Sequence, residues 1–216
     1  MNKDAHDVYC IFRRIGSNGL VIFEQDDLLV RRKISPRNLM LGDINNELVE
    51  MLKQLREQDV LFGFVSHQTG LAAGIRGWPE YVGLTRMLDD LLSVRGALPD
   101  FWVAWTGSAR EDSVEFRNRR GTWRRRGAEM IWRAIDWYGI DKNKTVFVSS
   151  SSASTLAAND ADITGIQYSG WRSDRTVPAR PVAEACRLAS PSEIMEVGRL
   201  RACLERILGL AGRRTA

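Results

Sequence analysis

Three apolar runs separated by helical patterns constrain this chain more than any other feature of its sequence. Residues 20–23, 60–65 and 145–148 have the length and the apolar continuity of strands that are buried on both faces. Apolar residues recur at helical spacing over 44–58, before the second run, and over 128–138, before the third. Strands that alternate with helices of this length predict an α/β fold: a Rossmann-like parallel sheet between two layers of helices.

The chain is predicted to form one domain over residues 1–216. Its 216 residues are 44% hydrophobic, which suits one core of moderate size. The segment 103–126 has weak periodicity and many polar residues, and we expect an irregular, Arg-rich loop there after a strand that begins near Trp102. An amphipathic helix is predicted over 192–210, because an apolar stripe recurs there and Gly209 is a suitable stop.

Charge and cysteine usage narrow the class of protein. The formal net charge is +4, and no apolar run is long enough to span a membrane. The first ten residues lack the apolar segment of a signal peptide. The three cysteines, Cys10, Cys186 and Cys203, show neither metal-ligand spacing nor a disulfide plan. We therefore expect a cytoplasmic protein with reduced thiols.

Polar residues follow each of the three predicted strands at its carboxyl end. Segments 24–27, 66–70 and 149–152 read EQDD, SHQTG and SSSS. In a parallel α/β sheet, ligands bind beyond the carboxyl ends of the strands. Three polar segments that converge on one crevice therefore predict a site there. The acids Glu24, Asp26 and Asp27 stand out, because crowded carboxylates beside a buried strand repel one another and are costly to desolvate.

Four motifs in order carry a resemblance to a known family. They are VIFEQDDLLV at 21–30, VSHQTGLAAG at 65–74, RRRGAEM at 124–130 and VSSSSASTLAANDADI at 148–163. Across roughly residues 18–168, the chain resembles the haloacid dehalogenase (HAD) superfamily, and within it the histidinol-phosphate and heptose-bisphosphate phosphatases. In that group the corresponding motifs read D-x-D-G-T-L, T-N-Q-S-G-I-x-x-G, R-K-P and G-D-x-x-x-D.

The resemblance implies catalytic positions that this sequence fills unusually. Glu24 stands where the group has its nucleophilic aspartate, and Asp26 keeps the position of the general acid/base. Asp27 and Leu28 replace the glycine and threonine that follow. A glutamate carboxylate reaches about 1.5 Å further than an aspartate, and a misplacement of about 1 Å can slow an in-line attack on the order of 100-fold.

Three further positions are implied to bind phosphate. Ser66 keeps the hydroxyl residue of the second motif, His67 replaces its asparagine, and Arg125 replaces the lysine of the third. Arginine keeps the positive charge and binds phosphate in a fork. His67 has a second interpretation, since such a histidine often satisfies only a backbone carbonyl.

The metal positions depart most from the family pattern. The resemblance implies that Glu24, Asp26, Ser150 and Ser154 occupy the places around magnesium, where the last two would be aspartates. Magnesium prefers carboxylate oxygens to neutral hydroxyls, so we expect weak magnesium binding or none. Asp160 and Asp162 would serve only if the register shifted. Segment 103–123 contains no cysteine, so no structural zinc is expected.

These departures favour a phosphatase-like protein that binds a phosphorylated small molecule or protein partner with little or no hydrolysis. One alternative is an active phosphohydrolase that uses Glu24 or Asp26. The other is a non-catalytic interaction protein with an empty crevice. The stretch RNRRGTWRRR, 117–126, suits a phosphorylated partner or a solvated loop; its shortness and the modest net charge argue against nucleic acid. A homo-oligomer is compatible with the apolar stripe of the C-terminal helix.

Overall fold

The computed structural model describes residues 8–30, 41–67, 78–105, 119–169, 194 and 196–210. Six strands form one sheet in the order β1-β4-β3-β2-β5-β6. Strand β1 pairs antiparallel with β4 at one edge, and every other pair is parallel. The strands are β1 (Val8–Phe12), β2 (Leu20–Glu24), β3 (Leu61–His67), β4 (Phe101–Trp105), β5 (Thr145–Ser149) and β6 (Thr164–Gln167).

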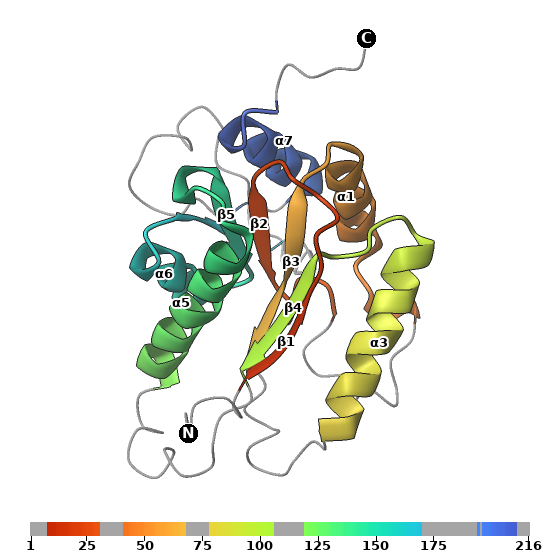
Figure 1. The fold of residues 1–216 in the computed structure, drawn as a ribbon, viewed down its shortest axis with the longest axis horizontal. Coiled ribbons are helices and arrows are strands. Elements are labelled where there is room, and N and C mark those ends of the chain that lie inside the picture. The colour runs from red at the N-terminus through yellow and green to blue at the C-terminus, as the bar shows by residue number, and fades with distance from the viewer. Residues whose placement is uncertain are drawn as a thin grey trace, which may run out of the picture.

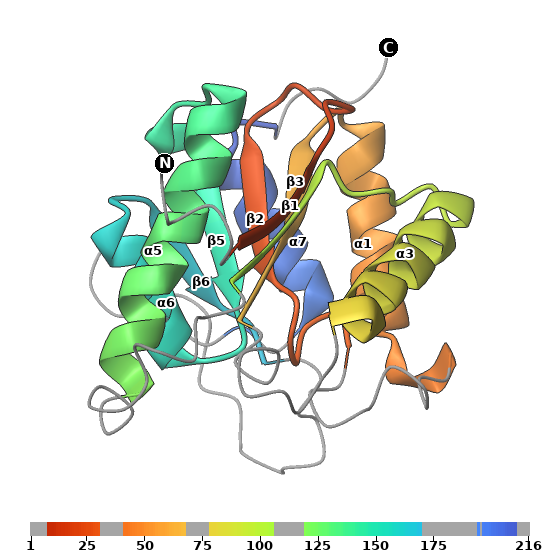
Figure 2. The same cartoon turned by 60° about the horizontal axis from the view of Figure 1, so that its bottom comes forward.

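Helices cover both faces of this sheet (Figures 1 and 2). The core on one face contains residues of α1 (Asn46–Glu57), α3 (Trp78–Val94) and α7 (Val197–Ile207), and the core on the other contains residues of α5 (Arg119–Tyr138) and α6 (Ser152–Asp160). Short 3-10 turns, η3 (Leu41–Asp43) and η5 (Lys142–Lys144), precede α1 and β5. The three-layer α/β architecture predicted from the sequence is confirmed.

Strand β2 shows how the sequence divides between the two cores. Val21 and Phe23 point to the α1/α3/α7 side, and Leu20 and Ile22 to the α5/α6 side. All four are fully buried. A strand in the middle of a sheet that is covered on both faces has no side for polar residues, which explains why its sequence is an unbroken apolar run.

Helix α7 closes the α1 side of the domain. It buries Leu200 and Leu204 in the same core as α1 residues, and Arg201 donates to Gln54 of α1 at 2.5 Å. The predicted helix over 192–210 is thus present with tighter bounds, and its apolar stripe covers its own domain. No helix in the described part of the chain is long and apolar enough to cross a membrane.

The prediction of an irregular loop over 103–126 is wrong at both ends of that segment. Residues 103–105 belong to β4, and α5 begins at Arg119, so the arginines from 119 to 126 lie in a helix. Arginine is a good helix former, but this stretch has few apolar residues, so it shows no stripe. Residues 106–118 lie outside the described ranges.

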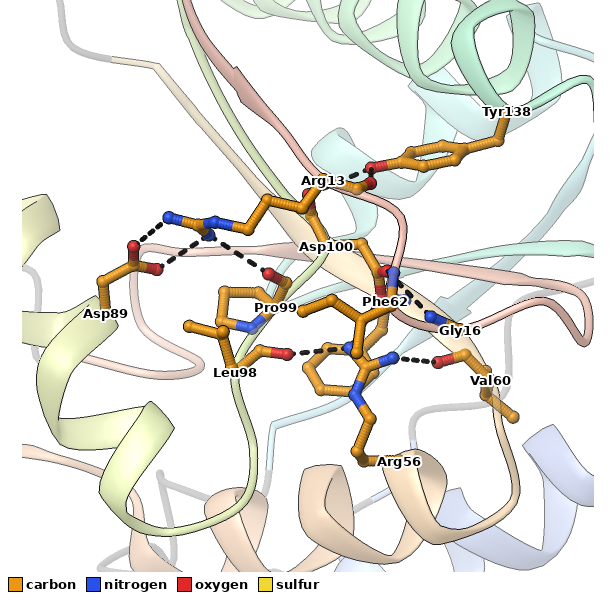
Figure 3. A network of polar contacts seen from close by, with 11 residues as sticks. Arg13, Gly16, Arg56, Val60, Phe62, Asp89, Leu98, Pro99, Asp100 and Tyr138 are labelled. Carbon is orange, nitrogen blue, oxygen red and sulfur yellow. Dashed lines mark hydrogen bonds and ion pairs between the residues drawn. The ribbon is translucent and has the colours of Figure 1, made fainter.

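A buried carboxylate organises the amino end of the sheet (Figure 3). Asp100 precedes β4 and is fully buried. Its Oδ1 accepts from the backbone N–H groups of Ile15 and Gly16 at 2.6 and 3.0 Å. Its Oδ2 accepts from the Phe62 N–H at 3.0 Å and from the Arg56 guanidinium at 2.7 Å. One side chain thus joins four segments of the chain.

A second carboxylate extends this network outward. Asp89 of α3 pairs with the Arg13 guanidinium and accepts from the indole N–H of the buried Trp102 at 2.8 Å. The Tyr138 hydroxyl at the end of α5 donates to the backbone carbonyls of Arg13 and Asp100, at 2.6 and 3.0 Å. Helices from both faces are therefore anchored at the same end of the sheet.

We predict that Asp100→Ala lowers the free energy of unfolding by about 3 to 5 kcal/mol, because it leaves the half-buried Arg56 guanidinium without its counter-charge and three N–H groups without their acceptor. Chemical denaturation measures this loss. Asp136→Ala, at an exposed position on α5, is the matched control and should change stability by about 0.5 kcal/mol or less. Equal effects of the two substitutions would contradict the role given to Asp100.

Candidate functional site

The described parts of the three polar segments, 24–27, 66–67 and 149–152, lie at one edge of the sheet, and residues 68–70 lie outside the described ranges. Strands β3 and β5 pair with β2 on its two sides, and all three run in the same direction. Ser66 near the end of β3, Glu24 at the end of β2 and Ser150 just after β5 therefore share the carboxyl edge. Glu24 continues the alternation of Leu20 and Ile22, so its side chain points to the α5/α6 side, where α6 begins.

Glu24 is held there by two serines. Its Oε2 accepts from the backbone N–H and from the hydroxyl of Ser150, at 3.0 and 3.2 Å. Its Oε1 accepts from the Ser154 hydroxyl at 3.0 Å. The two residues in the metal positions of the resemblance thus contact the residue in the nucleophile position. We call Glu24, Ser150 and Ser154 the carboxylate–serine cluster.

Neighbouring residues of α6 hold the serines in place. Ser151 is the N-cap of α6, and its hydroxyl accepts from the Ser154 N–H at 3.2 Å. The Ser151 and Ser154 hydroxyls are 2.9 Å apart. Since Ser154 donates to Glu24, Ser151 donates to Ser154, and the hydroxyls form a chain that polarises each bond towards the carboxylate. The serine run therefore leads from β5 into a capped helix.

Burial dominates the electrostatics of Glu24. The residue is 5% exposed. Burial raises the pKa of its carboxyl, against the lowering effects of the Ser150 N–H and the Ser154 hydroxyl, and the nearby charge of Asp26 raises it further. The hydrogen bonds therefore offset only part of the cost of removing a charge from water.

The turn after β2 keeps a special backbone conformation. Asp27 has φ 62°, in the left-handed region, where the resemblance places a glycine. Aspartate enters that region more readily than most residues. The Asp27 N–H donates to the Val30 carbonyl at 2.9 Å, which closes the turn. Asp26 is half-buried beside Glu24, at the general acid/base position.

Tyr81, which the sequence analysis missed, joins the site from α3. Tyr81 is buried, and burial raises the pKa of its hydroxyl. A hydrogen bond with Ser66 lowers this pKa in part, and the nearby charge of Asp26 raises it. Ser66 itself is buried. The available signal was the helical spacing of Tyr81, Leu84 and Leu88. His67 pairs with Trp105 in the sheet; its side chain lies outside the described part of the structure.

Positive charge lies at the same edge of the sheet. The Arg126 guanidinium sits over the Trp105 ring, 5.3 Å from its centroid, and pairs with Glu129 at 3.0 Å. Trp105 ends β4, so this part of α5 lies at the carboxyl edge. Arg125 is adjacent and exposed. Its predicted approach to a phosphate beside Ser66 stays a prediction.

The alternative acids of the last motif lie elsewhere. Asp162 pairs with Lys142, which precedes β5, at 3.6 Å, so it lies at the amino end of the strands. Asp160 is exposed at the far end of α6. Ser150 and Ser154, by contrast, contact Glu24.

These residues do not fit a tight magnesium site. Magnesium is usually bound through carboxylates, but the positions at 150 and 154 hold neutral hydroxyls. Both of these hydroxyls donate their protons to Glu24, whose two oxygens are thereby occupied. Within the described ranges, no group of three or more His, Cys, Asp or Glu residues could hold a metal ion.

Comparison with known proteins supports the fold. No protein-family model matches the sequence, and no curated protein matches it. A crystal structure from Mesorhizobium loti, described as a HAD-like phosphatase, matches with a TM-score of 0.66 and 16% identity, over 93% of this chain and 94% of that one. The D,D-heptose 1.7-bisphosphate phosphatase from B. bronchiseptica, complexed with magnesium and phosphate, matches with a TM-score of 0.59 and 16% identity, over 87% and 98%.

At this identity the likeness concerns the fold. The chain has the fold of these two structures, as the resemblance to the HAD superfamily predicted. The assignment of the four motifs, residue by residue, stays a prediction. The chemistry of the site must be argued from its own residues.

We predict that Glu24 makes the protein less stable as pH rises. Burial raises its pKa above the ordinary 4.5, so between pH 4.5 and the raised value the folded state keeps a proton that the unfolded chain has lost. The stabilisation that this proton gives the folded state is complete below pH 4.5 and is lost as the pH rises through the raised pKa. Glu24→Gln removes the titration. The free energy of unfolding of the wild type should fall relative to this variant as pH rises; a constant difference would contradict the prediction.

Proposed function

We propose that this protein binds a phosphorylated small molecule or protein partner at its carboxyl-edge site and hydrolyses it little or not at all. The observation that carries this proposal is the carboxylate–serine cluster. A HAD-like phosphatase needs a free carboxylate that attacks phosphorus and a cation that screens the two negative charges. Here the carboxylate is buried and hydrogen-bonded by neutral serines.

Loss of the cation affects the reaction more than the change of nucleophile. Without a divalent ion, the phosphate charge faces the Glu24 and Asp26 carboxylates, and nothing replaces the ion's stabilisation of the transition state. A longer nucleophile would slow the attack, but missing metal ligands also remove the means to bring substrate and nucleophile together. Magnesium binding is therefore proposed to be weak or absent.

Recognition of phosphate has separate support. The exposed Arg125 lies beside Arg126, which Trp105 and Glu129 hold at the carboxyl edge. Ser66 lies at the same edge on β3. An arginine forms paired, charge-assisted bonds with phosphate oxygens. Binding without cleavage is thus chemically consistent, since these groups act without a metal.

We predict that hydrolysis returns only when several residues are restored together. Glu24→Asp alone should gain little, because the metal ligands are still missing. Ser150→Asp alone should recover part of the magnesium binding. The triple variant with Ser154→Asp added should gain more than the single changes suggest, because residues that act as a unit are non-additive. The measurement is turnover of a small aryl phosphate with magnesium.

Two outcomes would revise the proposal. Robust turnover by the unmodified protein, abolished by Glu24→Gln, would establish an active phosphohydrolase instead. A triple variant that folds and binds magnesium yet gains no activity would show that the crevice has been rebuilt for another purpose.

We also predict that phosphate ligands raise the melting temperature. Inorganic phosphate, sugar phosphates and nucleotides are compared in a thermal-shift series, because a ligand that binds only the folded state stabilises it. Arg125→Ala should weaken binding about tenfold, by loss of a charge-assisted contact. Lys53→Ala, on the exposed side of α1, should leave it unchanged. No shift with any ligand would favour the interaction protein with an empty crevice.

A further inference from the structure

We propose that the carboxylate–serine cluster fixes the carboxyl end of β2 to the start of α6 by hydrogen bonds, without a cation. This inference concerns what stabilises the fold and does not depend on the ligand or on catalytic activity. It rests on three observations: where backbone pairing stops, how the donors are arranged, and how the lengths of the three side chains match.

Backbone pairing between β2 and β5 stops just before the cluster. The last paired residues are Phe23 and Val148. Glu24, the last residue of β2, still pairs with Val65 of β3 but has no backbone partner in β5, and Ser150 follows the last residue of β5. The three hydrogen bonds from Ser150 and Ser154 continue the connection through side chains. They fix the end of the strand to the first turn of the helix.

The donors suit a carboxylate and no cation. The start of a helix carries partial positive charge and free N–H groups, which favour an anion. Glu24 supplies that anion from within the chain. Aspartates at 150 and 154 would instead surround Glu24 with like charges in a buried place, and only a bound cation could hold them together.

The side-chain lengths are also complementary. The extra methylene of glutamate carries the carboxylate about 1.5 Å beyond the reach of an aspartate, and serine is the shortest hydroxyl side chain. Glu24 therefore spans the distance to both hydroxyls with ordinary bond lengths. The residues at 24, 150 and 154 differ from the family pattern together, and each fits the other two. Reverting a single position should therefore weaken the hydrogen bonds of the cluster.

Melting temperatures in EDTA and in magnesium test this proposal on the full chain. The wild type should melt at the same temperature in both. Ser150→Ala combined with Ser154→Ala, and separately Glu24→Asp, should each lower the melting temperature by about 5 °C or more, because bonds to a buried charged group are lost. Ser152→Ala is the matched control: it changes a serine in the same turn whose side chain is exposed. It should shift melting by about 1 °C or less.

A second experiment converts the carboxylate–serine cluster into a cation site. Ser150→Asp combined with Ser154→Asp should lower the melting temperature in EDTA and recover part of the loss in magnesium. If the double alanine variant does not fold, the two single alanine variants take its place. The proposal is overturned if the alanine variants melt like the Ser152→Ala control, or if magnesium raises the melting temperature of the wild type.

Discussion

The carboxylate of Asp100 joins four parts of the chain at the amino end of the sheet. It accepts from two backbone N–H groups after β1, from the Phe62 N–H in β3 and from the Arg56 guanidinium near the end of α1. A buried carboxylate is tolerated only when donors surround it. Asp100 therefore links these segments at one point beside the sheet.

Glu24 obeys the same rule at the opposite end of the sheet, but with different donors. Asp100 has a guanidinium among its partners, and a full opposite charge balances it. Glu24 has one N–H and two neutral hydroxyls, so burial still raises its pKa. The amino end is thus a charge-balanced structural centre. The carboxyl end keeps an incompletely balanced acid, at the position that the sequence resemblance assigns to the nucleophile.

Particular elements show where inference from sequence succeeds. The runs at 20–23, 60–65 and 145–148 are strands, because a strand covered on both faces must be apolar throughout. Strand β1, VYCIF, was missed although its apolar, β-branched and aromatic residues gave a signal. The start of α5 was expected to be a loop, because periodicity detects a helix only by its buried stripe. Helix α6, SASTLAAND, has small residues and weak amphipathicity, so no pattern of hydrophobicity predicted it.

The sequence by itself determined the alternation of strands and helices and the edge at which polar residues gather, and it placed serines at 150 and 154, where the resemblance would have aspartates. These follow from local chemistry and spacing. Only the tertiary structure decided that Ser150 and Ser154 donate to Glu24, that Tyr81 comes from α3 to meet Ser66, and that Asp162 lies at the wrong end of the sheet. Such contacts join residues up to 130 positions apart, and no pattern within a short window records which side chains will satisfy a buried charge.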